Sequence, residues 1–332
     1  LPAEGDLAAM IASTNARLAV LPVWPPDDPR VQRMPKVLDR LLDRGVEAVA
    51  ELAAVRPARA AAAGVDPHQV TAFLARGPDG WRTDLEPLVA NFGLRVSHWT
   101  VGPLELPENA AARVDPADVP AAVRRLGEAL PAPLVMLAES AIVATGTEGA
   151  DELIAKIPAE ADPHSIPEWV DGRFETIELE LPSIDRAVDA EIDLALRVLH
   201  GWLAGAQTVL VRLPFDHASM GSRGLDPGPT LPALRTLADN LQGRRVVTTL
   251  RLGDGIHALV LAGRERQDGA LAIWRDGRAG DPPRDVAVRL GSNPVEQVTL
   301  RGERAWLSQD AAGRHVIPVS PEPTFIEGVD LD

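Results

Sequence analysis

The feature that most constrains the fold is an alternation of short apolar runs with amphipathic helical runs over about the first 245 residues. The run 18–24 (LAVLPVW) is typical of a buried strand, and 35–45 (PKVLDRLLDRG) of a helix that ends at Gly45. Strands that alternate with helices form a parallel sheet covered by helices, either open and doubly wound or closed as a (β/α)8 barrel. Further strands are expected within 46–55, 94–102, 133–139, 174–182 and 208–214, further helices within 85–93, 118–130 and 231–241, and one more strand and helix within 140–173, around AIVAT and DELIAKI.

The pattern changes after residue 245. Short apolar runs such as VVTTLRL, HALVLAG and ALAIWRD are separated by turn signals such as GDG, QDG and GSNP, and no helical stripe follows them. This texture is typical of an antiparallel β-sandwich. The sequence therefore predicts an α/β domain over 1–245 and a β-sandwich domain over 246–332.

The segment FETIELELP (174–182) alternates polar and apolar residues. A strand would place Thr176, Glu178 and Glu180 on one face, because successive side chains of a strand point to opposite sides. That face either is solvated and paired with arginines, or looks into an active site. A helix with Ser183 as its N-cap is expected to follow, and Trp202 on that helix and Trp306 in the β-domain are expected in the core.

Composition excludes several classes of protein. The net charge of −15 disfavours a nucleic-acid partner, because phosphate binding requires clustered lysine and arginine. No apolar run approaches 18 residues, so no membrane span is expected. The chain has no cysteine, no G-x-G-x-x-G or Walker sequence and no H-x-x-x-H or H-E-x-x-H spacing, so neither a cofactor nor a metal site is predicted. The arginine-rich, lysine-poor composition is typical of a GC-rich bacterium, and a cysteine-free chain is compatible with a secreted or periplasmic protein as with any other compartment.

Several segments resemble glycoside hydrolases that combine a (β/α)8 barrel with a C-terminal β-sandwich. The run GALAIWRDG, then DVAVRL, SQDAAG and HVIPVSPEPTFIEG, resembles their β-sandwich. LHGWLAGAQTVLVRLPFD resembles the helix and strand that complete their barrel, and DRLLDRGVEAVAELA resembles their second helix and third strand. The resemblance implies a (β/α)8 barrel in which 174–182 is the seventh strand and 208–214 the eighth. The first strand would then lie before Leu1, or the N-terminal segment would deviate from the pattern.

In the retaining, two-glutamate enzymes of this type, the nucleophile ends the seventh strand and the acid/base follows the fourth, which implies that Glu180 is the nucleophile. The fourth-strand sequence HWTVGPLELPE matches the family at Trp99 and Gly102 but has Pro103 and Leu104 where asparagine and the acid/base glutamate are expected. Glu105 follows one residue later. Glu139, which ends the next predicted strand, is a second candidate for the acid/base.

The implied ligand is a poly- or oligosaccharide. The residues expected to bind it lie at or near the ends of the predicted strands: Trp24, His98, Trp99, Glu178, Asp216 and His217. Aromatic rings stack on sugars, although core packing is the alternative for both tryptophans. The altered fourth-strand motif also favours a second hypothesis, an inactive homologue that serves as a carbohydrate-binding or assembly protein. The sugar, its linkage and the oligomeric state are open at this point.

Overall fold

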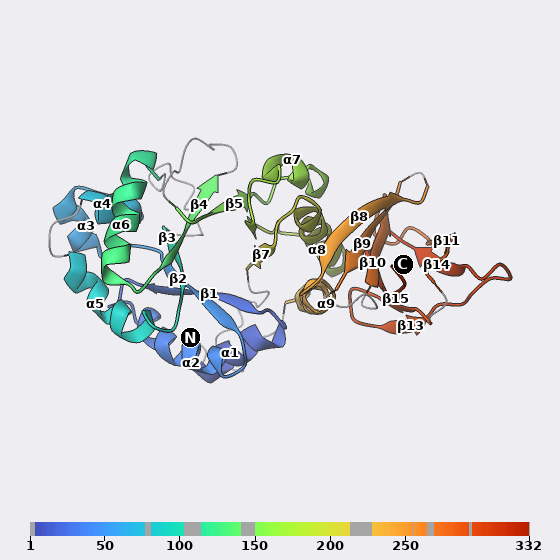
Figure 1. Ribbon diagram of the computed structural model, residues 1–332, viewed down its shortest axis with the longest axis horizontal. Helices are drawn as coiled ribbons and strands as arrows, with labels where there is room; N and C mark the ends of the chain where they lie inside the picture. The colour runs from blue at the N-terminus through green and yellow to red at the C-terminus, as the bar shows by residue number, and fades with distance from the viewer. Residues whose placement is uncertain are drawn as a thin grey trace. The chain divides into compact units, whose positions relative to one another are not determined.

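The computed structural model describes residues 4–76, 81–102, 114–140, 150–212, 228–253, 255–263, 269–291 and 294–331. By packing, the chain forms two compact units, each built from several stretches of sequence (Figure 1). The first comprises residues 1–158, 169–180 and 205–211, and the second 159–168, 181–204 and 212–332. No helix in the described ranges has the length and apolar character of a membrane span.

The first unit is built on a seven-stranded parallel sheet in which the strands follow one another in chain order. This is the sheet of an incomplete (β/α)8 barrel, as the alternating pattern predicts; within the described residues, the edge strands β1 and β7 are not paired with each other. Of the strand and helix expected around AIVAT and DELIAKI, DELIAKI contains the strand β5, and AIVAT lies outside the described residues. The strands are β1 (Leu18–Trp24), β2 (Glu47–Leu52), β3 (His98–Val101), β4 (Leu134–Ser140), β5 (Glu152–Ile157), β6 (Thr176–Leu179) and β7 (Thr208–Val211).

Helices connect these strands and shield the sheet. In α2 the buried side chains repeat at helical spacing, from Met34 to Val37, Leu38 and Leu41, which is the apolar stripe that packs against β1 and β2. The helical elements of this part of the chain are α1 (Glu4–Ser13), η1 (Val31–Arg33), α2 (Met34–Leu42), α3 (Pro57–Ala63), α4 (Val70–Arg76), α5 (Trp81–Phe92), η3 (Pro116–Asp118), α6 (Val119–Ala129), η4 (Pro163–Ser165) and α7 (Ile166–Val170).

The sheet of the first unit has two chemically different faces. One face is apolar along its whole length and buried, with Leu21, Ala50, Val135 and Ile177 among its residues. The opposite face carries a small apolar cluster of Val49, Met136 and Ile154, against which Leu18, Val20 and Leu210 pack. We call this second face the lumen face, because a barrel sheet turns one face to its helices and the other to its interior. The lumen face is where polar side chains interrupt the apolar pattern.

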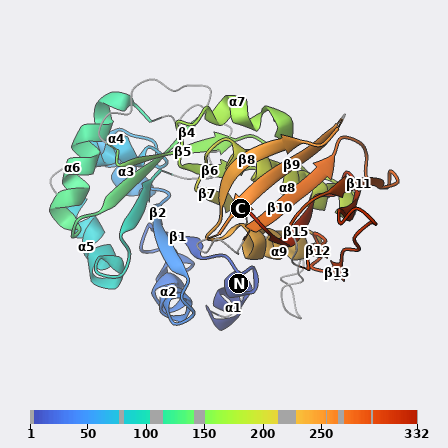
Figure 2. The ribbon, with the colours of Figure 1, turned by 45° about the vertical axis from the view of Figure 1, so that its right-hand side comes forward.

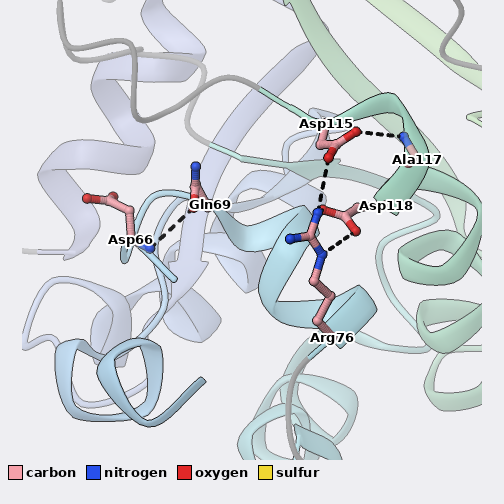
Figure 3. Close-up of polar contacts among 6 residues, drawn as sticks. All are labelled: Asp66, Gln69, Arg76, Asp115, Ala117 and Asp118. Atoms are coloured by element: carbon pink, nitrogen blue, oxygen red, sulfur yellow. Dashed lines mark hydrogen bonds and ion pairs between the residues drawn. The ribbon is translucent and has the colours of Figure 1, made fainter. Parts of the chain in front are cut away.

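An ion-pair network fastens α4 to the start of α6 (Figure 3). Arg76, the last residue of α4, donates from Nε to Asp118 Oδ1 over 2.7 Å and from Nη2 to Asp118 Oδ2 over 2.6 Å. The same Nη2 reaches Asp115 Oδ2 at 3.0 Å, and the other oxygen of Asp115 accepts the backbone N–H of Ala117. Asp118 is buried, so the two-point contact satisfies a carboxylate that water does not reach.

The second unit contains the predicted β-sandwich. Six antiparallel strands form one sheet in the order β13-β12-β15-β10-β9-β8, and β11 pairs with β14 in a two-stranded sheet (Figure 2). The buried side chains between the sheets include Leu271, Ile273, Ile317 and Ile326. The strands are β8 (Arg245–Arg251), β9 (Ile256–Ala262), β10 (Gly269–Arg275), β11 (Arg284–Val288), β12 (Glu296–Val298), β13 (Arg304–Trp306), β14 (His315–Val319) and β15 (Thr324–Val329).

Two helices, α8 (Ala187–Leu203) and α9 (Leu231–Leu241), belong to the second unit with the sandwich. The packing units therefore do not follow the linear division between 245 and 246, although the strands of the sandwich do begin at Arg245. That division remains a prediction about domains. The helix predicted from Ser183 begins later, at Ala187, because Arg186 is extended (φ −90°, ψ 119°) and no helical turn passes through it.

The prediction that Trp306 lies in the core is wrong. Trp306 is 71% exposed. It ends β13, which is the edge strand of the six-stranded sheet, and all three residues of that strand are exposed. An edge position leaves the ring without neighbours on one side. Trp202, at the end of α8, is half-buried.

Candidate functional site

The candidate site lies at the carboxyl ends of β5 and β6. Lys156 Nζ contacts Glu180 Oε1 at 2.7 Å, and the backbone N–H of Glu180 donates to the carbonyl of Ile157 over 3.0 Å. The lysine side chain is 10% exposed, whereas the glutamate side chain is 41% exposed. A nearly buried ammonium thus compensates a carboxylate that still reaches solvent. Functional sites of barrel folds gather at this edge of the sheet.

The polar face of FETIELELP lies on the lumen face. Parallel pairing puts Thr176 beside Ile154 and Glu178 beside Lys156 and Leu210. Because paired residues in adjacent strands project to the same side, Glu178 shares its face with the cluster around Ile154. Thr176 Oγ1 donates a short hydrogen bond to Glu152 Oε1. The alternation in this strand therefore serves the interior of the sheet, with Glu178 one step deeper than Glu180.

Two further polar residues lie on the lumen face of neighbouring strands. Glu51 on β2 is in register with Thr100 on β3, and Thr100 with Met136 of the lumen cluster. Thr100 is buried, and its Oγ1 has no hydrogen-bond partner among the described residues. A buried hydroxyl of this kind is costly unless water or a ligand satisfies it. Sequence reasoning missed both residues.

The predicted sugar-stacking tryptophans are core residues. Trp99 is fully buried, and its register with Ala50 and Val135 puts it on the apolar face, away from the lumen. Its indole N–H donates to the carbonyl of Val96 over 3.2 Å. Trp24 is 1% exposed and packs on Phe73, with ring centroids 5.9 Å apart. Neither ring has an exposed face for a sugar in this structure.

His98 lies on the lumen face, but as the first residue of β3 it is at the opposite end of the strand from the carboxyl edge. Its Nδ1 is 3.0 Å from the hydroxyl of the neighbouring Ser97. Glu139 lies in β4 with its backbone in register with Ala155 of β5, and its side chain is outside the described part of the structure. Glu105, Asp216 and His217 lie outside the described residues.

Lys156 is the residue of this site that sequence reasoning missed. A signal was present, because the chain contains only two lysines and DELIAKI alternates like FETIELELP. Glu152, Ile154 and Lys156 are spaced by two, which puts them on one face of a strand. No group of histidine, aspartate or glutamate side chains in the described ranges is arranged to hold a metal ion.

Comparison with known proteins identifies the fold. No protein-family model and no curated relative matches the sequence. Among solved structures, the chain is similar to a GH30 endoxylanase from Clostridium papyrosolvens C71, with a TM-score of 0.67, 10% identity, and coverage of 98% of this chain and 93% of that one. For a GH30 subfamily 8 xylanase from Clostridium acetobutylicum the TM-score is 0.63 and the identity 10%, with coverage of 99% of this chain and 93% of that one. For an α-amylase from Anoxybacillus the TM-score is 0.60 and the identity 9%, with coverage of 99% of this chain and 90% of that one. The chain therefore has the fold of glycoside hydrolases with a (β/α)8-type barrel and a β-sandwich.

Proposed function

We propose that the protein is a glycoside hydrolase that acts on a poly- or oligosaccharide by the retaining mechanism, with Glu180 as the nucleophile. One observation carries the proposal: Glu180 stands at the carboxyl end of β6, half-exposed and ion-paired with Lys156. A nucleophile must be ionised and must reach the anomeric carbon. The nearly buried ammonium of Lys156 gives the carboxylate a countercharge, and the exposure of Glu180 allows it to reach a substrate.

The mechanism requires a second carboxyl group on the other side of the glycosidic bond. Retaining enzymes place the two carboxyl groups about 5 Å apart, one ionised and one protonated. Glu105 and Glu139 are the candidates for the acid/base, since Glu105 follows β3 in the sequence and Glu139 lies near the end of β4. In the first step Glu180 attacks the anomeric carbon while the acid protonates the departing oxygen. In the second step the residue that served as the acid acts as a base and takes a proton from the water that releases the sugar from Glu180.

Lys156 acts through Glu180 in this proposal. While the glycosyl–enzyme bond exists, Glu180 is a neutral ester and Lys156 has no carboxylate opposite it. Departure of the sugar restores the ion pair. The contact at 2.7 Å thus favours the free carboxylate both before the attack and after hydrolysis.

The test uses a panel of activated aryl glycosides with the full chain. Wild type is expected to release the aryl group with retention at the anomeric carbon, which proton NMR of the fresh product reads directly. Glu180→Gln is expected to abolish turnover, whereas Glu178→Gln, two residues away on the same face and predicted to bind the sugar, should retain part of it. A 2-fluoro glycoside should label the peptide that contains Glu180. Turnover by Glu180→Gln at the wild-type rate would exclude Glu180 as the nucleophile.

A second candidate function is carbohydrate binding without hydrolysis. It is favoured by Pro103 and Leu104, which occupy the positions expected for asparagine and the acid/base glutamate. Glycan-array binding by wild type, with no turnover of any aryl glycoside and no label on Glu180, would support this alternative. In that case the Lys156–Glu180 pair has a structural role.

A further inference from the structure

Three of the seven histidines meet in the second unit, around one buried tryptophan. His164 comes from η4, His200 from α8, His257 from β9 and Trp274 from β10. The rings of His164 and His200 are 4.7 Å apart between centroids, and those of His164 and His257 6.3 Å apart. Trp274 lies 5.7 Å from His200, edge to face, and 5.6 Å from His257, stacked. We call these four side chains the histidine cluster.

His200 is the buried member of the cluster. The residue is 7% exposed, and neither of its ring nitrogens has a hydrogen-bond partner among the described residues. The indole nitrogen of Trp274 is buried in the same way. A neutral imidazole needs one donor and one acceptor partner, whereas the protonated ring carries two donors and an uncompensated charge. The surroundings of His200 therefore favour the neutral ring strongly over the charged one.

The charged groups around His200 come from each element packed on it. On the η4 side these are His164 and Asp162, and on the sheet side His257 and Asp276, with His257 Nε2 held 2.8 Å from Asp276 Oδ1. Burial, then His164 and His257, lower the pKa of His200 to about 4, while Asp162 and Asp276 oppose the shift. Asp276 contacts the ring of His257, whereas Asp162 accepts the backbone N–H of His164 over 3.0 Å, and neither carboxylate is hydrogen-bonded to His200.

On α8 itself, the neighbouring charged residues Asp193 and Arg197 make their hydrogen bonds with each other and with backbone carbonyls, not with His200. Arg197 is buried, donates to Asp193 over 2.7 Å, and donates to the carbonyls of Ala159 and Ala161 over 2.7 and 2.8 Å. These bonds hold the segment before η4 against α8. They also fix the position of His164 beside His200. The cluster thus joins three elements of the second unit: η4, α8 and the six-stranded sheet.

We propose that the histidine cluster is an acid-sensitive latch, which in its neutral form holds α8 and η4 against the six-stranded sheet and which opens in acid. His200 gains a proton only where water solvates the charge, and water reaches it only when α8 separates from Trp274. Acid therefore favours the open arrangement. The latch does not depend on the function proposed for Glu180.

The size of the effect follows from the two protonation equilibria of His200. The ring titrates at 6.5 when it is exposed and at about 4 in the closed cluster. At pH 5.0 the open or unfolded form is then favoured about 30-fold more than at pH 7.5 by this one group. The sign is fixed because the closed form binds fewer protons than the open form below pH 6.5. The loss is complete only below pH 4.

The experiment compares the full-length wild type with His200→Leu and His200→Gln. In urea unfolding, the equilibrium constant for unfolding should rise between pH 7.5 and pH 5.0 by about 30-fold more in wild type than in either variant. His68→Gln, an exposed histidine of the first unit, is the control and should behave as wild type. Proton–carbon NMR of labelled histidines, with His200 assigned by its absence in a variant, should show a neutral ring at pH 5.5.

Three results would overturn the latch. The first is an equal acid loss in wild type and in both His200 variants. The second, which needs no variant to fold well, is a His200 ring that titrates near 6.5 in the native protein. The third is a stoichiometric transition metal that a chelator removes with loss of stability, which would make the cluster a metal site.

Discussion

Replacement of Arg197 by methionine should destabilise the second unit more than any exposed charge change on the same helix. Arg197 is 2% exposed. Its guanidinium donates to the carboxylate of Asp193 and to two backbone carbonyls, those of Ala159 and Ala161. Methionine retains much of the apolar stem and none of the donors. The substitution therefore leaves one buried and two partly buried acceptors without their hydrogen bonds.

The expected cost is about 3–5 kcal/mol, which is the range for removing one partner of a buried ion pair. Most of this cost is the desolvation penalty of the acceptors that lose their donor. Burial already raises the pKa of Asp193, against the effect of Arg197. Without the arginine this pKa rises further above its unfolded value, so the folded carboxyl binds a proton more readily. The contribution of Asp193 to the cost of the substitution should then shrink as the pH falls.

The assay is urea unfolding followed by far-UV circular dichroism, with amide hydrogen exchange to report on the segment around Ala159 and Ala161. Arg186→Met is the matched control next to the same helix, because Arg186 directly precedes α8, pairs with Asp189 at 3.3 Å and has a side chain that is 69% exposed. The control should change stability by less than about 0.5 kcal/mol. If Arg197→Met also stays within about 1 kcal/mol of wild type, the buried arginine does not join α8 to the preceding segment as argued.

Three further predictions concern the two units. Lys156→Met should cost about 1 kcal/mol in urea unfolding, because Glu180 is half-exposed, but should lower aryl-glycoside turnover far more; an equal effect on both would make the pair structural. Ile154→Ala should cost about 2–5 kcal/mol by creating a cavity in the lumen cluster, and a smaller loss would show that the cluster collapses around it. Gly291→Ala should destabilise more than Gly313→Ala in thermal unfolding. Both glycines have positive φ, but an added Cβ at Gly291 would lie 2.4 Å from a side-chain carbon, whereas Gly313 has open space. Equal costs would refute the steric argument.

The periodicity of the sequence predicted most of the fold. Runs of alternating or continuous apolar residues predicted most of the strands in the parallel sheet and in the sandwich, because burial of one face imposes a period of two or 3.6. Around AIVAT and DELIAKI they predicted one strand and one helix without assigning either. The sequence predicts an N-cap at Ser183, whereas α8 begins at Ala187. A good capping residue does not start a helix when a following residue, here Arg186, is extended. The grouping of α8 with the sandwich was not visible either. It depends on contacts between distant segments, such as that of His200 with Trp274, and no local pattern encodes these.

The candidate site was less predictable than the fold. A tryptophan at the end of a strand has the same sequence signature whether it stacks on a ligand or packs in the core, and Trp24 and Trp99 are both core residues. The role of Lys156 could not be predicted locally, because it arises from the pairing of β5 with β6, a separate segment of the sequence. The buried hydroxyl of Thr100 has no sequence signature at all. Local periodicity gives the face of a residue, whereas its partner depends on the register between strands.

The register of β5 against β6 is what distinguishes the two glutamates of FETIELELP. Pairing of Ile154 with Thr176 puts the backbone of Lys156 beside Glu178, yet the long lysine side chain carries its ammonium upward to Glu180. A slip of one residue would turn both glutamates toward the apolar face. The alternation in sequence thus places two carboxylates on the lumen face, and the register gives the one at the carboxyl edge an ammonium contact at 2.7 Å. For this reason Glu180→Gln is expected to lower activity far more than Glu178→Gln, a chemically identical change two residues earlier in the strand.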